Sequence, residues 1–408
     1  MINDEHPHKM RMGYKEDSMY LQSQKTKNNS IPKISKKKQF LQDQDVARWH
    51  KYMARSSISN ADTSLRRLRL FCEKHKIKPM ELVELANKNM KELKYLIIDH
   101  LNWMNEKGYS SEYQRGILKV IKNWLRFNDI SIDIPFKHGD TRLAKIQKLP
   151  DEDEYIDIIN KADMRARVII ALISKAGLRP QVIGNYEGTD GLRLKDMPDI
   201  KIINGKAICR KYPCMIKVRA ELSKNNKPYV TFLSKQGVRY LLTYLNDRLK
   251  KGEVLTADSP IITRDYRYEY IRRDKPFITT ITVCKEVRDV VNEYKIRPYD
   301  LRHWFATQLE IAVAKGKISS SVKEELMGHI SGIEHHYTYA KYNLVEDLVK
   351  ELRESYSRTE EFLDVEVSNK DNDEEMLREE AKTILERFNK DELLNFLANA
   401  GKGNSLNR

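Results

Sequence analysis

The sequence predicts a mainly α-helical protein with one small antiparallel β-sheet. Apolar residues recur every three or four positions through most of residues 40–130 and again from residue 155 onward, which is the spacing of a helix with one buried face. The stretch around Asn204-Gly205 instead combines short apolar runs with turn residues, as strands do. At 408 residues, with 40% hydrophobic and 33% charged residues, the chain is long enough for two or three domains.

The net charge of +15 is unevenly distributed along the chain. The segment from Thr359 to the end holds 13 acidic and 7 basic residues, a net charge of −6, so residues 1–358 carry +21. An excess of this size on the main body indicates a polyanionic partner, and nucleic acid is the usual one; a general solubility charge is the alternative.

The composition also bears on compartment and cofactors. No apolar run approaches the roughly 18 residues of a membrane span, and the N-terminus has no signal-peptide core, so we expect a cytoplasmic protein. The four cysteines form no Cys-x-x-Cys pair and therefore do not predict a zinc site.

The N-terminal third predicts a basic arm followed by a helical bundle. Residues 1–37 are rich in Lys, Ser, Asn and Gln and poor in apolar residues, so we expect a flexible arm. Within residues 38–143, Asp62-Thr63 is expected to cap one helix, a second ends at Gly108, and a third begins near Ser110. The third helix has an outward basic face that could contact nucleic acid or simply be solvated, formed by Arg115, Lys119, Lys122 and Arg126.

Residues 144–153 contain a proline beside a run of acidic residues and predict a linker. Two helices follow within residues 154–360, and the second is apolar almost throughout and hence buried. Gly177 is expected to end it in the left-handed conformation, so that Arg179 follows a rigid core helix. Three short runs, 201–203, 215–219 and 229–233, predict one three-stranded antiparallel sheet with Asn204-Gly205 as its first turn and Lys224 at its second.

A further helix is predicted from Asp300, because Leu301, Phe305 and Leu309 recur every four residues. Tyr299 and Arg302 would then lie at the N-terminal end of that helix, a position that favours anions. Arginine adds a planar fork that stays protonated and pairs two phosphate oxygens at once. This end of the helix is therefore a candidate phosphate site.

The order of the polar groups is more specific than any one of them. Gly177-Leu178-Arg179 is followed by Lys224 in a turn-rich stretch, then by Leu-Arg302-His-x-Phe-Ala-Thr, by Leu-Met-Gly-His329 and by Tyr337. This order resembles the C-terminal signature of the tyrosine recombinases, in particular the integrases of archaeal mobile elements. The resemblance implies a helical core-binding domain at residues 38–143 and an α+β catalytic domain at residues 154–360.

The resemblance also implies a chemistry and a role for each residue. Tyr337 would attack a DNA phosphate and form a 3'-phosphotyrosine, without metal or other cofactor. Arg179 and Arg302 would hold the non-bridging oxygens, Lys224 would protonate the leaving oxygen, and His329 would hydrogen-bond the phosphate. Tyr299 stands where the family commonly has a histidine, and could donate a hydrogen bond there but not act as a base of histidine's pKa.

Three alternatives stay open at this stage. The family most often places its nucleophile nine residues after the Gly-His pair, where this chain has Thr338, so Tyr339 is the alternative to Tyr337. The same residues could serve a type IB topoisomerase-like enzyme or a catalytically inert DNA-binding relative. The family usually acts as a tetramer on double-stranded attachment sites, and the acidic tail, residues 361–408, predicts short amphipathic helices that dock either on their own protomer or on a neighbour.

Overall fold

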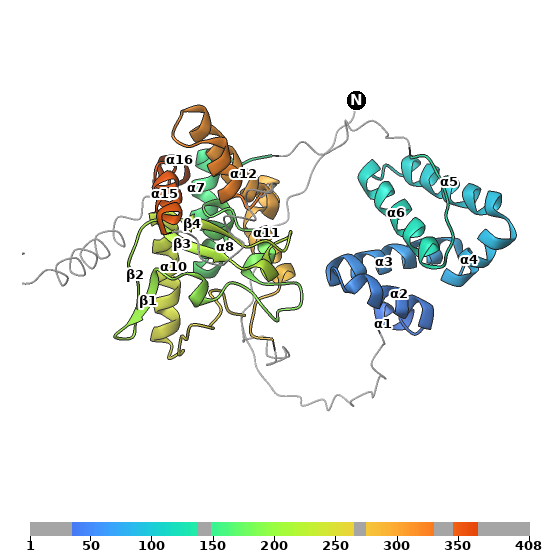
Figure 1. Ribbon diagram of the computed structural model, residues 1–408, viewed down its shortest axis with the longest axis horizontal. Helices are drawn as coiled ribbons and strands as arrows, with labels where there is room; N and C mark the ends of the chain where they lie inside the picture. The colour runs from blue at the N-terminus through green and yellow to red at the C-terminus, as the bar shows by residue number, and fades with distance from the viewer. Residues whose placement is uncertain (1–34, 137–147, 265–274, 330–345, 366–408) are drawn as a thin grey trace, which may run out of the picture. The chain divides into compact units, whose positions relative to one another are not determined.

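The computed structural model describes residues 35–136, 148–264, 275–329 and 346–365. The chain divides into two compact units, residues 1–141 and 142–408 (Figure 1). Each unit has an apolar core of its own. Helices dominate the described residues and the strands pair antiparallel, so the predicted class is confirmed. None of the helices in these ranges is long and apolar enough to cross a membrane.

The first unit is a helical bundle centred on two tryptophans. The rings of Trp49 and Trp124 meet edge to face with centroids 5.4 Å apart. Trp49 Nε1 donates to Asn123 Oδ1 at 2.8 Å and Trp124 Nε1 donates to Pro79 O at 2.9 Å, so both large side chains are buried with their polar groups satisfied. The described helices of this unit are α1 (Lys36–Phe40), α2 (Gln44–Ala54), α3 (Ile58–His75), α4 (Pro79–Lys88), α5 (Met90–Glu106) and α6 (Ser111–Phe127).

The predicted helix start at Asp62-Thr63 is wrong, because α3 begins one turn earlier. Ser57 is the N-cap, and its side chain accepts a hydrogen bond from the Asn60 N–H. Ala61 is fully buried, so this first turn already contributes to the core. The Asp62 carboxylate lies inside the helix and instead accepts hydrogen bonds from His50 Nε2 and Lys37 Nζ, each at 2.7 Å.

Two histidines in this unit make its stability depend on pH. His75 Nε2 and His100 Nδ1 lie 2.9 Å apart, and His100 is buried. Burial, then the neighbouring His75 and then Lys74 lower the pKa of His100 from 6.5 to about 4, and burial lowers the pKa of His75 as well. The unfolded chain therefore binds more protons between these values, and stability must fall as pH falls.

We expect the first unit to lose about 1–2 kcal/mol of its free energy of unfolding between pH 7 and pH 4.5, after allowing for solvent screening. Thermal unfolding of a Trp304→Phe protein, whose remaining tryptophans all lie in this unit, followed by fluorescence would measure the loss. A His100→Gln variant should show a flatter pH dependence. Equal pH dependence in both proteins would contradict the assignment.

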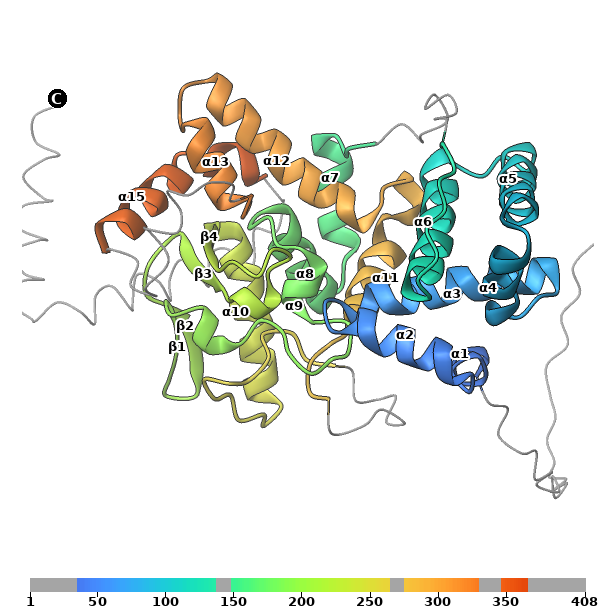
Figure 2. The same ribbon diagram turned by 45° about the vertical axis from the view of Figure 1, so that its right-hand side comes forward.

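The second unit is built around α8, whose residues are mostly buried. Figure 2 shows this helix in the middle of the unit. Helices α10, α11 and α12 pack directly against it. The described helices are α7 (Glu152–Lys161), α8 (Met164–Ser174), α9 (Pro180–Ile183), α10 (Lys235–Lys250), α11 (Thr280–Val291), α12 (Pro298–Ala314), α13 (Ser320–Leu326), α15 (Glu346–Ser357) and α16 (Glu360–Leu363), with 3-10 turns at Leu194–Asp196, Ala220–Leu222 and Asn292–Tyr294. The strands are β1 (Ile200–Ile203), β2 (Lys206–Cys209), β3 (Cys214–Val218) and β4 (Tyr229–Leu233).

The predicted single three-stranded sheet is wrong, because the described strands form two separate pairs. β1 pairs with β2 across the Asn204-Gly205 turn, and β3 pairs with β4. The strand that sequence reasoning missed, β2, is held against α10 by Asn246, whose Oδ1 accepts from the Ala207 N–H at 2.7 Å. It therefore completes a hairpin with β1 and leaves β3 free to pair with β4 alone.

The C-terminal end of the described chain is locked onto α8 and α10. Lys175 is fully buried, and its Nζ donates to Leu363 O at 2.5 Å and to Asp364 Oδ1 at 3.0 Å. Burial lowers the pKa of Lys175, and the Asp364 carboxylate opposes that shift. Gln236 adds a bond from its Nε2 to Val365 O at 2.6 Å. Residues 360–365 are therefore an integral part of the second unit.

Candidate functional site

Arg179 lies just beyond α8, as predicted, at the N-cap of the short helix α9. The backbone that leads to it is fixed at two carbonyls: Tyr356 Oη donates to Lys175 O at 2.5 Å, and Thr231 Oγ1 donates to Ala176 O at 3.0 Å. Gly177 follows with φ of +64°, the left-handed conformation that the sequence predicted. The backbone that positions the Arg179 guanidinium is therefore rigid.

Gly177 has a second role beyond its backbone conformation. A Cβ at this position would stand 2.4 Å from the ring of Phe305, a core residue of α12. We expect Gly177→Ala to lower the free energy of unfolding by about 2–4 kcal/mol through backbone strain and this clash together.

Gly316 provides the matched control, because its φ is +69° and no atom of the described residues beyond its chain neighbours lies within 4 Å of its Cβ position. Gly316→Ala should cost only the backbone strain, about 1 kcal/mol. Urea unfolding of the two variants would separate the cost of backbone strain from the cost of the clash with Phe305. Equal losses in the free energy of unfolding would contradict the close packing of Gly177 on Phe305.

Arg302 lies on the first turns of α12, as predicted, but it is far more buried than a solvated helix residue. It is 1% exposed, and its Nη2 donates to Met327 O at 2.5 Å. Its Nε and Nη1 have no hydrogen-bond partner among the described residues. Burial lowers the pKa of this arginine, and Arg179 lowers it further. A guanidinium left with unpaired N–H groups in the interior is costly unless a ligand completes it.

His329 follows a left-handed glycine, Gly328, at the end of α13. Its Nδ1 lies 3.2 Å from Glu324 Oε2, and its side chain is 43% exposed. Burial lowers the pKa of His329, as do the charges of Arg302 and Arg179, while Glu324 opposes them. The structure therefore brings together three of the predicted site residues, Arg179, Arg302 and His329.

The other predicted site residues are exposed or lie outside the described part of the chain. Tyr299 is exposed at the start of α12, where its ring meets that of His303 edge to face with centroids 4.9 Å apart. Lys224 lies in the connection between β3 and β4, with an exposed side chain that forms no ion pair or hydrogen bond with any other described residue. Tyr337 and Tyr339 lie outside the described residues.

Sequence reasoning missed one residue of the cluster, Tyr229. It is the first residue of β4 and is paired with Val218 at the end of β3. Its side chain is 2% exposed, and its hydroxyl faces the guanidinium groups of both Arg179 and Arg302. Its position five residues after Lys224 could have indicated a site residue. A tyrosine at the start of an apolar strand is, however, more often part of the core.

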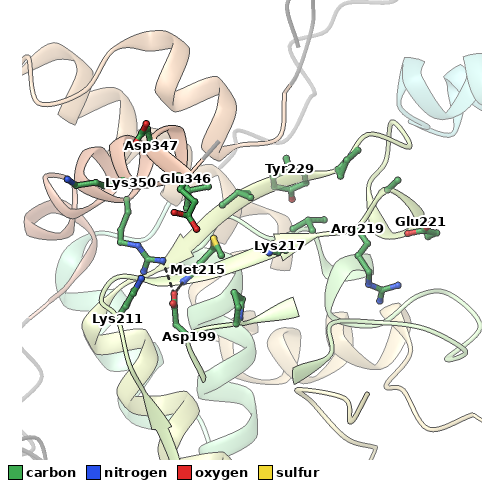
Figure 3. A pocket seen from close by; sticks show the side chains of 17 residues that line it. Asp199, Lys211, Met215, Lys217, Arg219, Glu221, Tyr229, Glu346, Asp347 and Lys350 are labelled. Carbon is green, nitrogen blue, oxygen red and sulfur yellow. Dashed lines mark hydrogen bonds and ion pairs between the residues drawn. The ribbon is translucent and has the colours of Figure 1, made fainter. Parts of the chain in front are cut away.

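A cavity of about 940 Å³ lies beside this cluster, between the β3–β4 pair and the start of α15 (Figure 3). Tyr229 lines it from β4, and Asp199 and Arg353, which form an ion pair at 2.9 Å, line it as well. Lys217 of β3 and Glu346 at the start of α15 also line it (Figure 3). The cavity has mixed charge, and Tyr229 is the residue that it shares with the arginine cluster.

Comparisons with known proteins find no matching family model and no matching curated relative. Solved structures similar to this chain include XerA recombinase, with 19% identity and a TM-score of 0.32 over 76% of this chain and 99% of that one. An integrase from mycobacterium phage Brujita has 12% identity and a TM-score of 0.31 over 80% and 95% of the two chains. The Tn1549 transposon integrase, in complex with transposon right end DNA, has 14% identity and a TM-score of 0.36 over 75% and 99%.

Proposed function

We propose that this chain is a phosphoryl-transfer enzyme that acts on DNA. The observation that carries the proposal is the state of Arg302: a buried guanidinium with two unpartnered N–H groups, next to a second arginine and a histidine. Such a cluster is completed by an anion with several acceptor oxygens, and a phosphate diester is the anion that suits a body carrying a charge of +21.

Within this class, the chain is proposed to be a site-specific DNA recombinase, an integrase, that cuts and rejoins strands. The support is the order of Arg179, Lys224, Arg302, His329 and Tyr337 along the chain. Tyr337 would attack the phosphorus as the bond to the 5'-oxygen breaks, and Lys224 would protonate that leaving oxygen so that it departs as a 5'-hydroxyl. The covalent 3'-phosphotyrosine would conserve the energy of the broken bond, so rejoining would require neither metal nor ATP.

Each remaining residue has a place in this scheme. Arg179 and Arg302 would stabilise the charge that develops on the non-bridging oxygens, and His329 would add a hydrogen bond to the same phosphate. Tyr299 would contribute a donor at the edge of the site. The basic helical unit would bind one side of the duplex, and strand exchange would take place in a tetramer on two attachment sites.

Two other functions use the same residues. A type IB topoisomerase-like enzyme would form the same covalent link but only relax DNA, and an inert relative would bind DNA without cutting it. Selection of covalent adducts from a library of nicked random duplexes, followed by sequencing, would identify the preferred site. Plasmids carrying two copies of that site should then yield recombinant products. Relaxation without recombinants would favour the topoisomerase, and DNA binding without adducts would favour the inert relative.

A further inference from the structure

The hydroxyl of Tyr229 has an unusual environment. It is buried and faces the guanidinium groups of Arg179 and Arg302. Guanidinium groups carry only donors, so neither arginine can accept the phenolic proton. No group among the described residues forms a hydrogen bond of good geometry with this hydroxyl. Among the described residues, the proton of Tyr229 therefore has no acceptor.

The same description applies to two N–H groups of Arg302, at Nε and Nη1. Three buried donors, from β4 and from α12, thus share one neighbourhood, and none of them forms a hydrogen bond of good geometry with a described residue. Unsatisfied buried donors each carry a penalty of about 1–3 kcal/mol, which native proteins rarely accept without a function. One anion with several oxygens would satisfy all three.

We propose that Tyr229 is a further phosphate-binding residue, whose hydroxyl donates a hydrogen bond to the DNA phosphate held by Arg179 and Arg302. The inference rests on the proposed function, because it names an additional donor at that same site. Burial raises the pKa of Tyr229 while both guanidinium groups oppose the shift, so the hydroxyl keeps its proton at neutral pH and remains a donor.

The ring of Tyr229 fixes this hydroxyl in place. A Cβ on Gly328 would lie 2.7 Å from the ring, so the residue before His329 has to be a glycine for the two to pack. The backbone of Tyr229 is held by its antiparallel pairing with Val218 of β3. The ring thus supports the backbone that carries His329. The hydroxyl is the part of the side chain that would donate to the phosphate.

Tyr229→Phe isolates the hydroxyl, because it keeps the ring and its packing on Gly328. We expect the rate of covalent cleavage on a nicked duplex carrying the selected site to fall about 100-fold, the usual effect of removing one donor at a developing oxyanion. DNA affinity should change little, and thermal stability should rise slightly, because a buried donor without an acceptor is removed. The pH dependence of cleavage should keep its shape, because the hydroxyl neither gains nor loses a proton.

Tyr240→Phe is the matched control. Tyr240 also has a buried hydroxyl with no partner among the described residues, but it lies on α10 beside Arg167. This variant should cleave at the wild-type rate. Wild-type cleavage by Tyr229→Phe, or an equal loss in both variants, would overturn the inference.

A second measurement is independent of cleavage. Inorganic phosphate should raise the melting temperature of the wild-type protein and of Tyr240→Phe, and should raise that of Tyr229→Phe distinctly less. If the wild type forms no covalent adduct but shows this difference, the proposed reaction fails while Tyr229 stands as an anion donor. If the wild type cleaves and Tyr229→Phe matches it in both assays, the donor role fails while the proposed reaction stands.

Discussion

Arg302→Lys is expected to reduce covalent cleavage by about two to three orders of magnitude while DNA affinity changes little. Lysine keeps the positive charge but lacks the fork, so the two N–H groups at Nε and Nη1 that have no partner among the described residues are lost. A single ammonium cannot pair two non-bridging oxygens in a fixed plane. Cleavage on a nicked duplex and equilibrium binding to an intact duplex would measure the two effects separately.

Arg165→Lys is the matched control, because Arg165 also forms a forked pair, with Glu286 at 3.0 and 2.6 Å, but outside the cluster. It should retain cleavage. Arg302→Met should remove the buried charge and raise the free energy of unfolding by about 1–3 kcal/mol while it abolishes cleavage. Parallel loss of stability and cleavage in both Arg302 variants would mean that this arginine has only a structural role.

Tyr337→Phe is expected to abolish covalent adduct formation and to leave DNA binding nearly unchanged, because one hydroxyl is lost from the proposed nucleophile. The residue lies outside the described ranges, so the expectation comes from its position eight residues after His329. Gel analysis of labelled nicked DNA after denaturation of the protein would detect the adduct.

Tyr339→Phe is the companion variant and should still form the adduct. The opposite pattern, with the adduct kept in Tyr337→Phe and lost in Tyr339→Phe, would reassign the nucleophile. Loss in both variants would indicate that one tyrosine attacks and the other supports it.

The site residues that could be predicted from the sequence are those marked by a pattern in the neighbouring residues. Arg179 follows an apolar helix and a glycine, and Arg302 lies at the start of a helix with clear periodicity. His329 follows a glycine in a left-handed turn. These three positions depend on short stretches of chain, and the structure brings all three together.

Tyr229 could not be found in this way, because its role depends on contacts between distant segments. Only the packing of β4 against Gly328, a residue 99 positions along the chain, turns an apparent core tyrosine toward two arginines. The strand β2 was missed because four residues of mixed polarity carry little pattern. Helix α11 carries many β-branched residues, and its packing on α8 and α12 overrides their preference for strands.

The most direct test of the proposed chemistry is the chemical identity of the link formed on a nicked duplex. Wild-type protein should retain the DNA after denaturation, with the 3'-phosphate joined to Tyr337 and a free 5'-hydroxyl on the released fragment. Peptide mapping of the adduct by mass spectrometry would identify the linked tyrosine and the phosphate end to which it is joined. A protein that binds the nicked duplex without any covalent product, or that joins to a 5'-phosphate, would contradict the proposed function.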